Sequence, residues 1–310
     1  MKKACLAAAA LCLITACGGP AARHPLLNPS LRNLRRIPLP PAKVKVMELV
    51  EQRLARGDAD HISVMFQCLS TGYWFGIGEH ENFIPASLLK SHLLITVLKA
   101  AQDEPGLLQR KVEYKDYSNV FTPGARPEQR VRPGRQFTFG HHYTIEQLLK
   151  QMIEQSDNNA AYNLQVSLAP GQFEQVLQDY GIRLPPDGAA FITLKNYMMM
   201  LLSLYNASYL SIEMSQRALD WLTLAAYDKG LAAGLPPGVH LANKFGEREL
   251  ISSSGSSTQL HDCGIIYHEQ APYLLGVMTR GSDLEKQTAI IRDISALVYA
   301  EVDAGVKAGR

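Results

Sequence analysis

Apolar and polar positions along the chain predict strands near both ends, with helices between them. Apolar residues at helical spacing predict an amphipathic helix over Val44 to Leu54. Two strand-like runs follow, His61 to Leu69 and Gly72 to Ile77, which Ser70-Thr71 would join as a hairpin. The chain therefore enters its folded part through one helix and a strand pair.

From Ser87 to about Tyr227 the pattern is mostly helical. The predicted helices cover Leu88 to Gln102, Thr144 to Gln155, Asn159 to Val166, Gln172 to Tyr180, Leu194 to Tyr205 and Ser215 to Ala226. Strands return after Pro236-Pro237-Gly238, over Val239 to Phe245, Ser256 to His268 and Tyr273 to Thr279, and a last helix spans Glu285 to Val302. This order predicts an α/β (α+β) fold of two lobes: an antiparallel sheet flanked by N- and C-terminal helices, and an inserted all-helical lobe at about 88–235. We expect a cleft where the lobes meet.

The first residues have the features of an export signal. Lys2 and Lys3 precede an apolar run that ends at Ala16, too short to span a bilayer. Ile14-Thr15-Ala16-Cys17 resembles the bacterial lipobox, which implies cleavage of residues 1–16 and lipidation of Cys17. An ordinary secretory signal is the alternative. The residue after Cys17 is Gly18, not the aspartate that signals retention in the inner membrane. We therefore expect a lipid anchor in the cell envelope, in the outer membrane facing the periplasm.

Proline and arginine then predict an extended tether at 17–43, followed by a domain at 44–303 and a tail at 304–310. Cys68 and Cys263 are the only cysteines of the domain. They could form one disulfide, but buried free thiols are common in strands, and we favour unpaired cysteines.

Composition and charge exclude several classes of function. The 310 residues are 46% hydrophobic and 19% charged, with a net charge of +2. Cleavage of the signal would remove Lys2 and Lys3 and leave a net charge of about zero. A chain so nearly neutral is not typical of nucleic-acid binding. The nine histidines show no metal-ligand spacing and no phosphate-binding loop is present, so we expect neither a metal nor a cofactor. The expected partners are a small-molecule or peptidoglycan-derived substrate and, through Cys17, a membrane; we expect a monomer.

Three short motifs contain the candidate chemistry. Ser87-Leu88-Leu89-Lys90 begins a predicted helix, where backbone N–H groups favour developing negative charge and Lys90 lies over Ser87. A lysine desolvated beside a hydroxyl can lose its proton and act as a base for a serine nucleophile. Ser156-Asp157-Asn158 ends another helix, and Lys244-Phe245-Gly246 lies in a strand, where glycine often marks close approach of a second backbone. Each motif alone also fits a surface helix, a helix end or an ordinary strand.

In this order the motifs resemble the S-x-x-K, S-D-N and K-[TS]-G set of class A β-lactamases and related penicillin-recognising serine hydrolases. The flanks are similar too: Phe83 to Lys90, Tyr143 through Ala161, and Gly230 through Lys244. The resemblance covers residues from about 44 to 303 and implies that family's fold.

The resemblance also implies roles for individual residues. Ser87 would be the acyl-accepting nucleophile, Lys90 its base and Ser156 the proton donor to the leaving nitrogen. Lys244 would hold the Ser156 hydroxyl and the substrate carboxylate, and Asn158 would bind the substrate amide. Gly246 and Glu247 belong to the substrate-binding strand; the N–H groups of Ser87 and Glu247 would form the oxyanion hole. Asp157 would support its loop.

Two departures from the family pattern affect the expected activity. The Ω-loop glutamate that activates the deacylating water is missing: no Glu lies between Gly181 and Thr193, where Asp187 is the only acid and is expected in an exposed turn. Slow deacylation is therefore expected. Phe245 also replaces the hydroxyl residue that binds the β-lactam carboxylate, a loss of about 1.5–3 kcal/mol. It could line an apolar subsite or point into the core, and Arg248 could supply another carboxylate contact.

Three functions remain open at this point. The first is a serine acyl hydrolase that forms an acyl-Ser87 with a β-lactam or a cell-wall peptide, amide or ester. The second is a true β-lactamase that deacylates by another route. The third is a non-catalytic envelope-binding lipoprotein that retains the fold. The combined presence of Ser87, Lys90, Ser156 and Lys244 argues against the third, and the missing glutamate argues against the second.

Overall fold

The computed structural model describes residues 42–117, 137–182, 190–252 and 255–308. The predicted signal, Cys17 and nearly all of the predicted tether lie outside these residues, as does Asp187. Within the part of the chain that is described, no helix combines the length and the apolar character needed to cross a bilayer.

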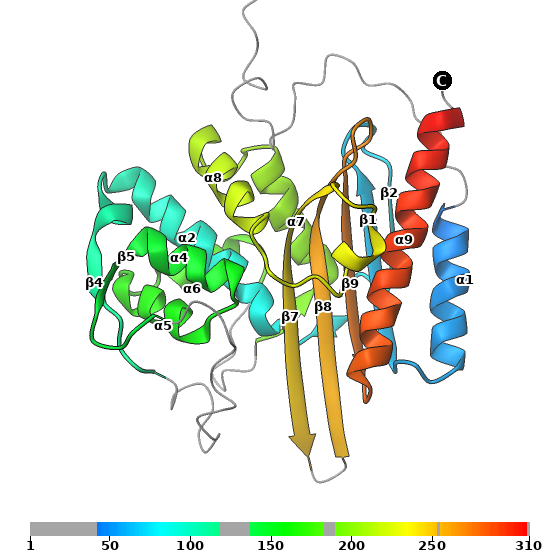
Figure 1. Cartoon of the computed structure of the whole chain (residues 1–310), viewed down its shortest axis with the longest axis horizontal. Coiled ribbons are helices and arrows are strands. Elements are labelled where there is room, and N and C mark those ends of the chain that lie inside the picture. The colour runs from blue at the N-terminus through cyan, green and yellow to red at the C-terminus, as the bar shows by residue number, and fades with distance from the viewer. Residues whose placement is uncertain (1–41, 118–136, 183–189, 253–254, 309–310) are drawn as a thin grey trace, which may run out of the picture.

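The centre of the fold is a five-stranded antiparallel sheet with the order β2-β1-β9-β8-β7 (Figure 1). Its strands are β1 (His61–Cys68), β2 (Trp74–Ile77), β7 (His240–Ser252), β8 (Gly255–Tyr267) and β9 (Tyr273–Gly281). Helices α1 (Ala42–Ala55) and α9 (Leu284–Ala308) lie side by side on one face of the sheet (Figure 1). Strand β7 forms one edge, next to the inserted helices.

The inserted segment forms the helical lobe on the other side of the sheet (Figure 1). Its helices are α2 (Leu89–Asp103), α4 (Ile145–Glu154), α5 (Asn158–Ser167), α6 (Gln172–Asp179), α7 (Leu194–Tyr205) and α8 (Ile212–Leu222). Short strands and 3₁₀ turns connect them: β3 (Asn82–Phe83), η2 (Ala86–Leu88), η3 (Leu107–Gln109), β4 (Lys111–Glu113), β5 (His142–Thr144), β6 (Ile192–Thr193) and η5 (Ala232–Gly234).

The alternation of side chains along β8 explains why the molecule has two hydrophobic cores. Cys263 and Ile265 pack into the core shared with the helical lobe, whereas Leu260 and Ile266 pack into the core under α1 and α9. Successive side chains of a strand point to opposite faces of its sheet, so both faces of β8 are covered. The predicted two-lobe α/β (α+β) arrangement is confirmed.

Local sequence signals fix the start of the helix that leads to the S-D-N segment. The side chain of Thr144 accepts a hydrogen bond from the backbone N–H of Gln147, and the Gln147 side chain accepts one from the backbone N–H of Thr144. This capping box satisfies N–H groups that the first turn of a helix leaves unpaired. The capping box therefore sets the start of α4 at Ile145, and the helix runs to Glu154, just before Ser156.

Several predicted boundaries change in the structure. Helix α1 begins at Ala42, inside the predicted tether, and α8 ends at Leu222 rather than Ala226. The backbone N–H of Ala226 instead donates to the carbonyl of Glu154, which ties the following segment to the end of α4. The predicted tail at 304–310 is wrong as far as residue 308, because α9 continues to Ala308 and buries Val306.

Strand β7 is also longer than predicted and continues beyond the third motif to Ser252. The whole strand pairs with β8, which runs back antiparallel from Gly255. Cys68 and Cys263 are buried free thiols, as we favoured.

Candidate active site

Ser87 lies in a short 3₁₀ turn, η2, directly before α2. Ala86 precedes it in the left-handed backbone region, with φ 47°. That conformation is costly for a residue with a Cβ atom and persists where the surroundings impose it. The prediction that Ser87 begins the long helix therefore needs a small correction: Ser87 belongs to a turn that leads into α2, and its side chain is half-buried.

The side chain of Lys90 is buried and brings two of the motifs together. Its Nζ donates to the Ser87 Oγ at 2.9 Å and to the Ser156 Oγ at 3.2 Å. It also donates to the Ser156 carbonyl at 2.7 Å and to the Asn158 Oδ1 at 2.5 Å. A cation removed from water is stable only where such acceptors compensate for the lost hydration. A surface-exposed Lys90, the alternative interpretation of S-x-x-K, is excluded by its 7% exposure.

Ser156 connects the two lysines. Its Oγ accepts hydrogen bonds from Lys90 and, at 3.0 Å, from the Nζ of Lys244. Its backbone has φ 54°, which turns the chain sharply between α4 and α5. Asp157 caps α5 by accepting from two backbone N–H groups and also accepts from the Tyr114 hydroxyl at 3.0 Å. These contacts confirm that Asp157 supports the loop.

Lys244 is fully buried, and its Nζ also donates to the Phe245 carbonyl at 3.0 Å. Behind it lies Asp262, which accepts from the Asn243 amide at 2.7 Å and from the Leu231 N–H at 2.9 Å. Burial raises the pKa of Asp262 to about 6, while these two donors and the positive charge of Lys244 act in the opposite direction. Asp262 therefore supplies negative potential behind the buried ammonium group.

The strand register places Gly246 against the nucleophile turn. A Cβ atom at Gly246 would lie 3.1 Å from the Ser87 nitrogen and 3.0 Å from the Pro85 carbonyl oxygen. The glycine predicted from K-x-G thus permits a close approach of β7 to η2.

Backbone alternation then places the Glu247 N–H at the same edge. In an antiparallel strand the N–H and C=O of one residue point to the same side, and this direction repeats every second residue. The Phe245 carbonyl accepts from Lys244 beside Ser156, so it points away from β8. The N–H of Glu247, two residues on, points the same way as that carbonyl. The strand thus directs the Glu247 N–H toward the edge at which Gly246 approaches the Ser87 nitrogen.

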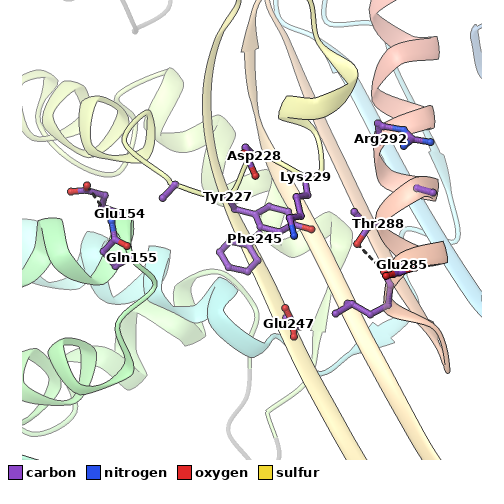
Figure 2. Close-up of a pocket in the computed structure, with 13 residues that line it drawn as sticks. Glu154, Gln155, Tyr227, Asp228, Lys229, Phe245, Glu247, Glu285, Thr288 and Arg292 are labelled. Carbon is purple, nitrogen blue, oxygen red and sulfur yellow. Dashed lines mark hydrogen bonds between the residues drawn. The ribbon is translucent and has the colours of Figure 1, made fainter. Parts of the chain in front are cut away.

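Phe245 faces the side of the sheet that α9 covers. Its ring stacks on Tyr227 with centroids 4.1 Å apart, and only 5% of it is exposed. The two rings border a pocket of about 710 Å³. Figure 2 shows its lining residues on the end of α4, on strand β7 and on helix α9. Glu247 lies on β7 below the two rings. The ring is almost fully covered, and the pocket that it borders is lined mostly by polar and charged side chains, so it is not the apolar subsite that one alternative expected.

Sequence reasoning missed two side chains that contact the nucleophile segment. Gln259 and His261, both on β8, bind the backbone of Ile84. The printed sequence offers no signal for them, because an isolated polar residue in a strand pattern has many uses. In the described residues, no group of three His, Cys, Asp or Glu side chains could hold a metal ion.

The region of the expected Ω loop is described only in part. Residues 183–189 lie outside the described chain, so the place of Asp187 is not part of the structure. After them Ile192–Thr193 forms β6, which pairs with β3, and Thr193 caps α7. Four arginines that the sequence places close together, Arg126, Arg130, Arg132 and Arg135, also lie outside the described residues.

Comparisons with known proteins agree with this geometry. Residues 45–302 match the model of the Beta-lactamase enzyme family. A reconstructed class A β-lactamase of the last common ancestor of Gram-negative bacteria is 25% identical, with TM-score 0.65 over 84% of this chain and 98% of that one. A PBP-A mutant, described as an acyl-enzyme complex with penicillin G, is 20% identical, with TM-score 0.68 over 85% and 96%. The class A β-lactamase of Mycobacterium abscessus is 20% identical, with TM-score 0.67 over 84% and 98%. No curated protein matches the chain.

Proposed function

Because the chain belongs to the β-lactamase enzyme family, and is a serine hydrolase of the β-lactamase or penicillin-binding-protein type, we propose that Ser87 forms an acyl-enzyme with a β-lactam or with a cell-wall peptide, amide or ester. The observation that carries this proposal is the pair of hydrogen bonds from the Lys90 Nζ, to the Ser87 Oγ at 2.9 Å and to the Ser156 Oγ at 3.2 Å. One amine in contact with both hydroxyls can move a proton between them.

The proposed acylation begins with proton transfer from Ser87 to Lys90. Lys90 in its uncharged form takes the proton of the Ser87 hydroxyl, and the Oγ forms a bond to the substrate carbonyl carbon. The N–H groups of Ser87 and Glu247 stabilise the oxyanion. The bond from the carbonyl carbon to the leaving nitrogen or oxygen then breaks. Ser156 gives its proton to the leaving atom and regains one from Lys90, while Lys244 holds the Ser156 Oγ in place.

Deacylation is proposed to be slow. Hydrolysis of the acyl-Ser87 ester needs a base within hydrogen-bond distance of a water molecule. The family's glutamate has no counterpart between Gly181 and Thr193, and β6 and α7 follow immediately. This favours an acyl hydrolase with a persistent acyl-enzyme over a β-lactamase with rapid turnover.

Incubation with benzylpenicillin, followed by intact-mass spectrometry, tests the proposal. We expect a stoichiometric increase equal to the mass of penicillin, mapped to Ser87, which persists for many minutes and is absent in Ser87→Ala. Rapid disappearance of penicillin without an observable adduct would instead indicate a true β-lactamase. Failure to react with penicillin and with a panel of activated esters and amides would identify a non-catalytic binding protein.

Exchange of Phe245 for Thr is expected to restore recognition of a substrate carboxylate. The matched control is Phe245→Val. Valine has the branched shape of threonine without its hydroxyl, and both variants lose the ring that stacks on Tyr227. One charge-assisted hydrogen bond corresponds to about 1.5–3 kcal/mol, so Phe245→Thr should bind penicillin roughly tenfold to a hundredfold more tightly than Phe245→Val. The concentration dependence of acylation measures this difference. Equal constants for both variants would show that a hydroxyl at position 245 does not bind the carboxylate.

Attachment to the outer membrane through a lipidated Cys17, facing the periplasm, is part of the proposal. It is supported by the basic start, the short apolar run and the lipobox-like end of residues 1–17. Metabolic labelling with a fatty-acid analogue should label the natural chain and leave Cys17→Ala unlabelled.

A further inference from the structure

The nucleophile turn is held from behind by two buried side chains of strand β8. The Nε2 of His261 lies 2.9 Å from the carbonyl oxygen of Ile84, and the backbone N–H of Ile84 donates to the Gln259 Oε1 at 2.9 Å. The backbone N–H and C=O of Ile84, three residues before Ser87, are therefore both hydrogen-bonded. His261 has no exposed surface and Gln259 is 2% exposed, so water does not compete for these bonds.

The protonation state of His261 fits a hydrogen-bond donor of fixed orientation. A carbonyl oxygen accepts only, so the Nε2 carries the hydrogen. Burial lowers the pKa of His261 to about 4, although the neighbouring carbonyl groups act to raise it. The ring is neutral at pH 7, and its edge-on contact with Phe83, at 5.4 Å between centroids, fixes its plane.

The position of His261 in the sheet links this contact to the substrate-binding strand. His261 is the direct partner of Gly246 across the β7–β8 pair, and Gln259 is the partner of Arg248. The same short stretch of β8 therefore binds β7 through its backbone and the nucleophile turn through its side chains. It therefore contacts both segments that contain the N–H groups of Ser87 and Glu247.

Backbone strain gives a reason why such a clamp is needed. Ala86 is in the left-handed region at φ 47°, a conformation that is costly for a residue with a Cβ atom. Without contacts that fix the chain before it, the turn could relax to an ordinary conformation and rotate the Ser87 N–H away from the substrate oxygen.

We propose that His261 and Gln259 are positioning residues, which clamp Ile84 and thereby fix the oxyanion-binding geometry between Ser87 and Glu247. Neither side chain touches the reacting atoms. The inference rests on the proposed acylation of Ser87 for its kinetic consequence, whereas the clamp itself can be measured without any substrate.

The kinetic test uses His261→Leu, which removes the donor, and His261→Gln, whose amide N–H can still reach a carbonyl oxygen. For His261→Leu we expect the maximal acylation rate to fall by about 10- to 100-fold, with little change in the penicillin concentration that gives half of that rate. His261→Gln should restore most of the rate. Gln259→Met should show a similar loss, and the double variant should lose less than the product of the two single effects.

The matched control is His268→Leu, which removes another buried histidine, just beyond the far end of β8, in contact with Asp303 and Tyr299. It should lower the melting temperature while leaving the acylation rate of the folded protein unchanged. A His261→Leu protein that is equally destabilised but acylates at the wild-type rate would overturn the proposal.

Amide hydrogen exchange in the unmodified protein covers the case in which these variants do not fold. The clamp requires the Ile84 N–H to exchange as slowly as the amides at the centre of β8. Exchange at the rate of an exposed loop would overturn the proposal. This readout needs no acyl donor, so a protein that does not react with penicillin would refute the proposed function and still leave the clamp measurable.

Discussion

Exchange of Lys90 for Met is expected to lower the rate of Ser87 acylation by about 10²–10⁴-fold, the usual contribution of a positioned base. Methionine has a similar length, so the buried space stays filled, but it cannot accept the Ser87 proton or return one to Ser156. The same substitution removes the Lys90 Nζ, which also donates to the carbonyl oxygen and Oγ of Ser156 and to the Asn158 Oδ1. The measurement is the rate of penicillin adduct formation under saturating conditions.

Lys99→Met is the matched control for this experiment. Lys99 lies on the same helix, α2, but on the surface of the lobe, where its Nζ bonds the Tyr209 hydroxyl at 2.8 Å. It should retain the acylation rate of the unmodified protein. Comparable rates for Lys90→Met and Lys99→Met would exclude Lys90 as the base.

Exchange of Gly246 for Val is expected to lower acylation by about 10²–10³-fold, the range typical of a damaged oxyanion hole. Even the first carbon of a side chain would lie 3.1 Å from the Ser87 nitrogen and 3.2 Å from that of Leu88. These neighbours are backbone atoms, so the strand and the turn must separate to relieve the contact. Gly246→Ala should give an intermediate loss.

Glu249→Val serves as the control, because it places the same side chain further along β7 at an exposed position. Circular dichroism and melting temperature should show both valine variants folded. Unchanged acylation in a folded Gly246→Val would contradict the role of the β7–η2 contact.

The order of elements could be predicted because it follows from short-range signals, whereas the convergence of the three motifs was predicted from their resemblance to the family's ordered set. Periodicity located α7 at its observed bounds, and ordered motifs with matching flanks placed Ser87, Lys90, Ser156 and Lys244 in one site. The bounds of α7 need only neighbouring residues, whereas grouping the motifs in one site needs the order of all three along the chain.

The features that were missed depend on contacts between distant segments. Helix α8 stops at Leu222 although apolar residues continue, because the chain there bonds Glu154. The role of His261 depends on which residue of β7 it pairs with and on the path of Ile84, and neither can be read from spacing along β8. Helix α9 extends further than predicted because Val306 packs into the hydrophobic core under α1 and α9.

The pairing of the first strand with the last has a consequence for how the chain reaches its functional form. His61 of β1 pairs with Arg280 of β9, with the whole helical lobe inserted between them. The central sheet therefore cannot form until β9 has been synthesised, and long-range pairing of this kind is slow. A chain truncated before β7 should have no acyl-accepting activity, since it lacks Lys244 and the strand β8 that contacts the nucleophile segment.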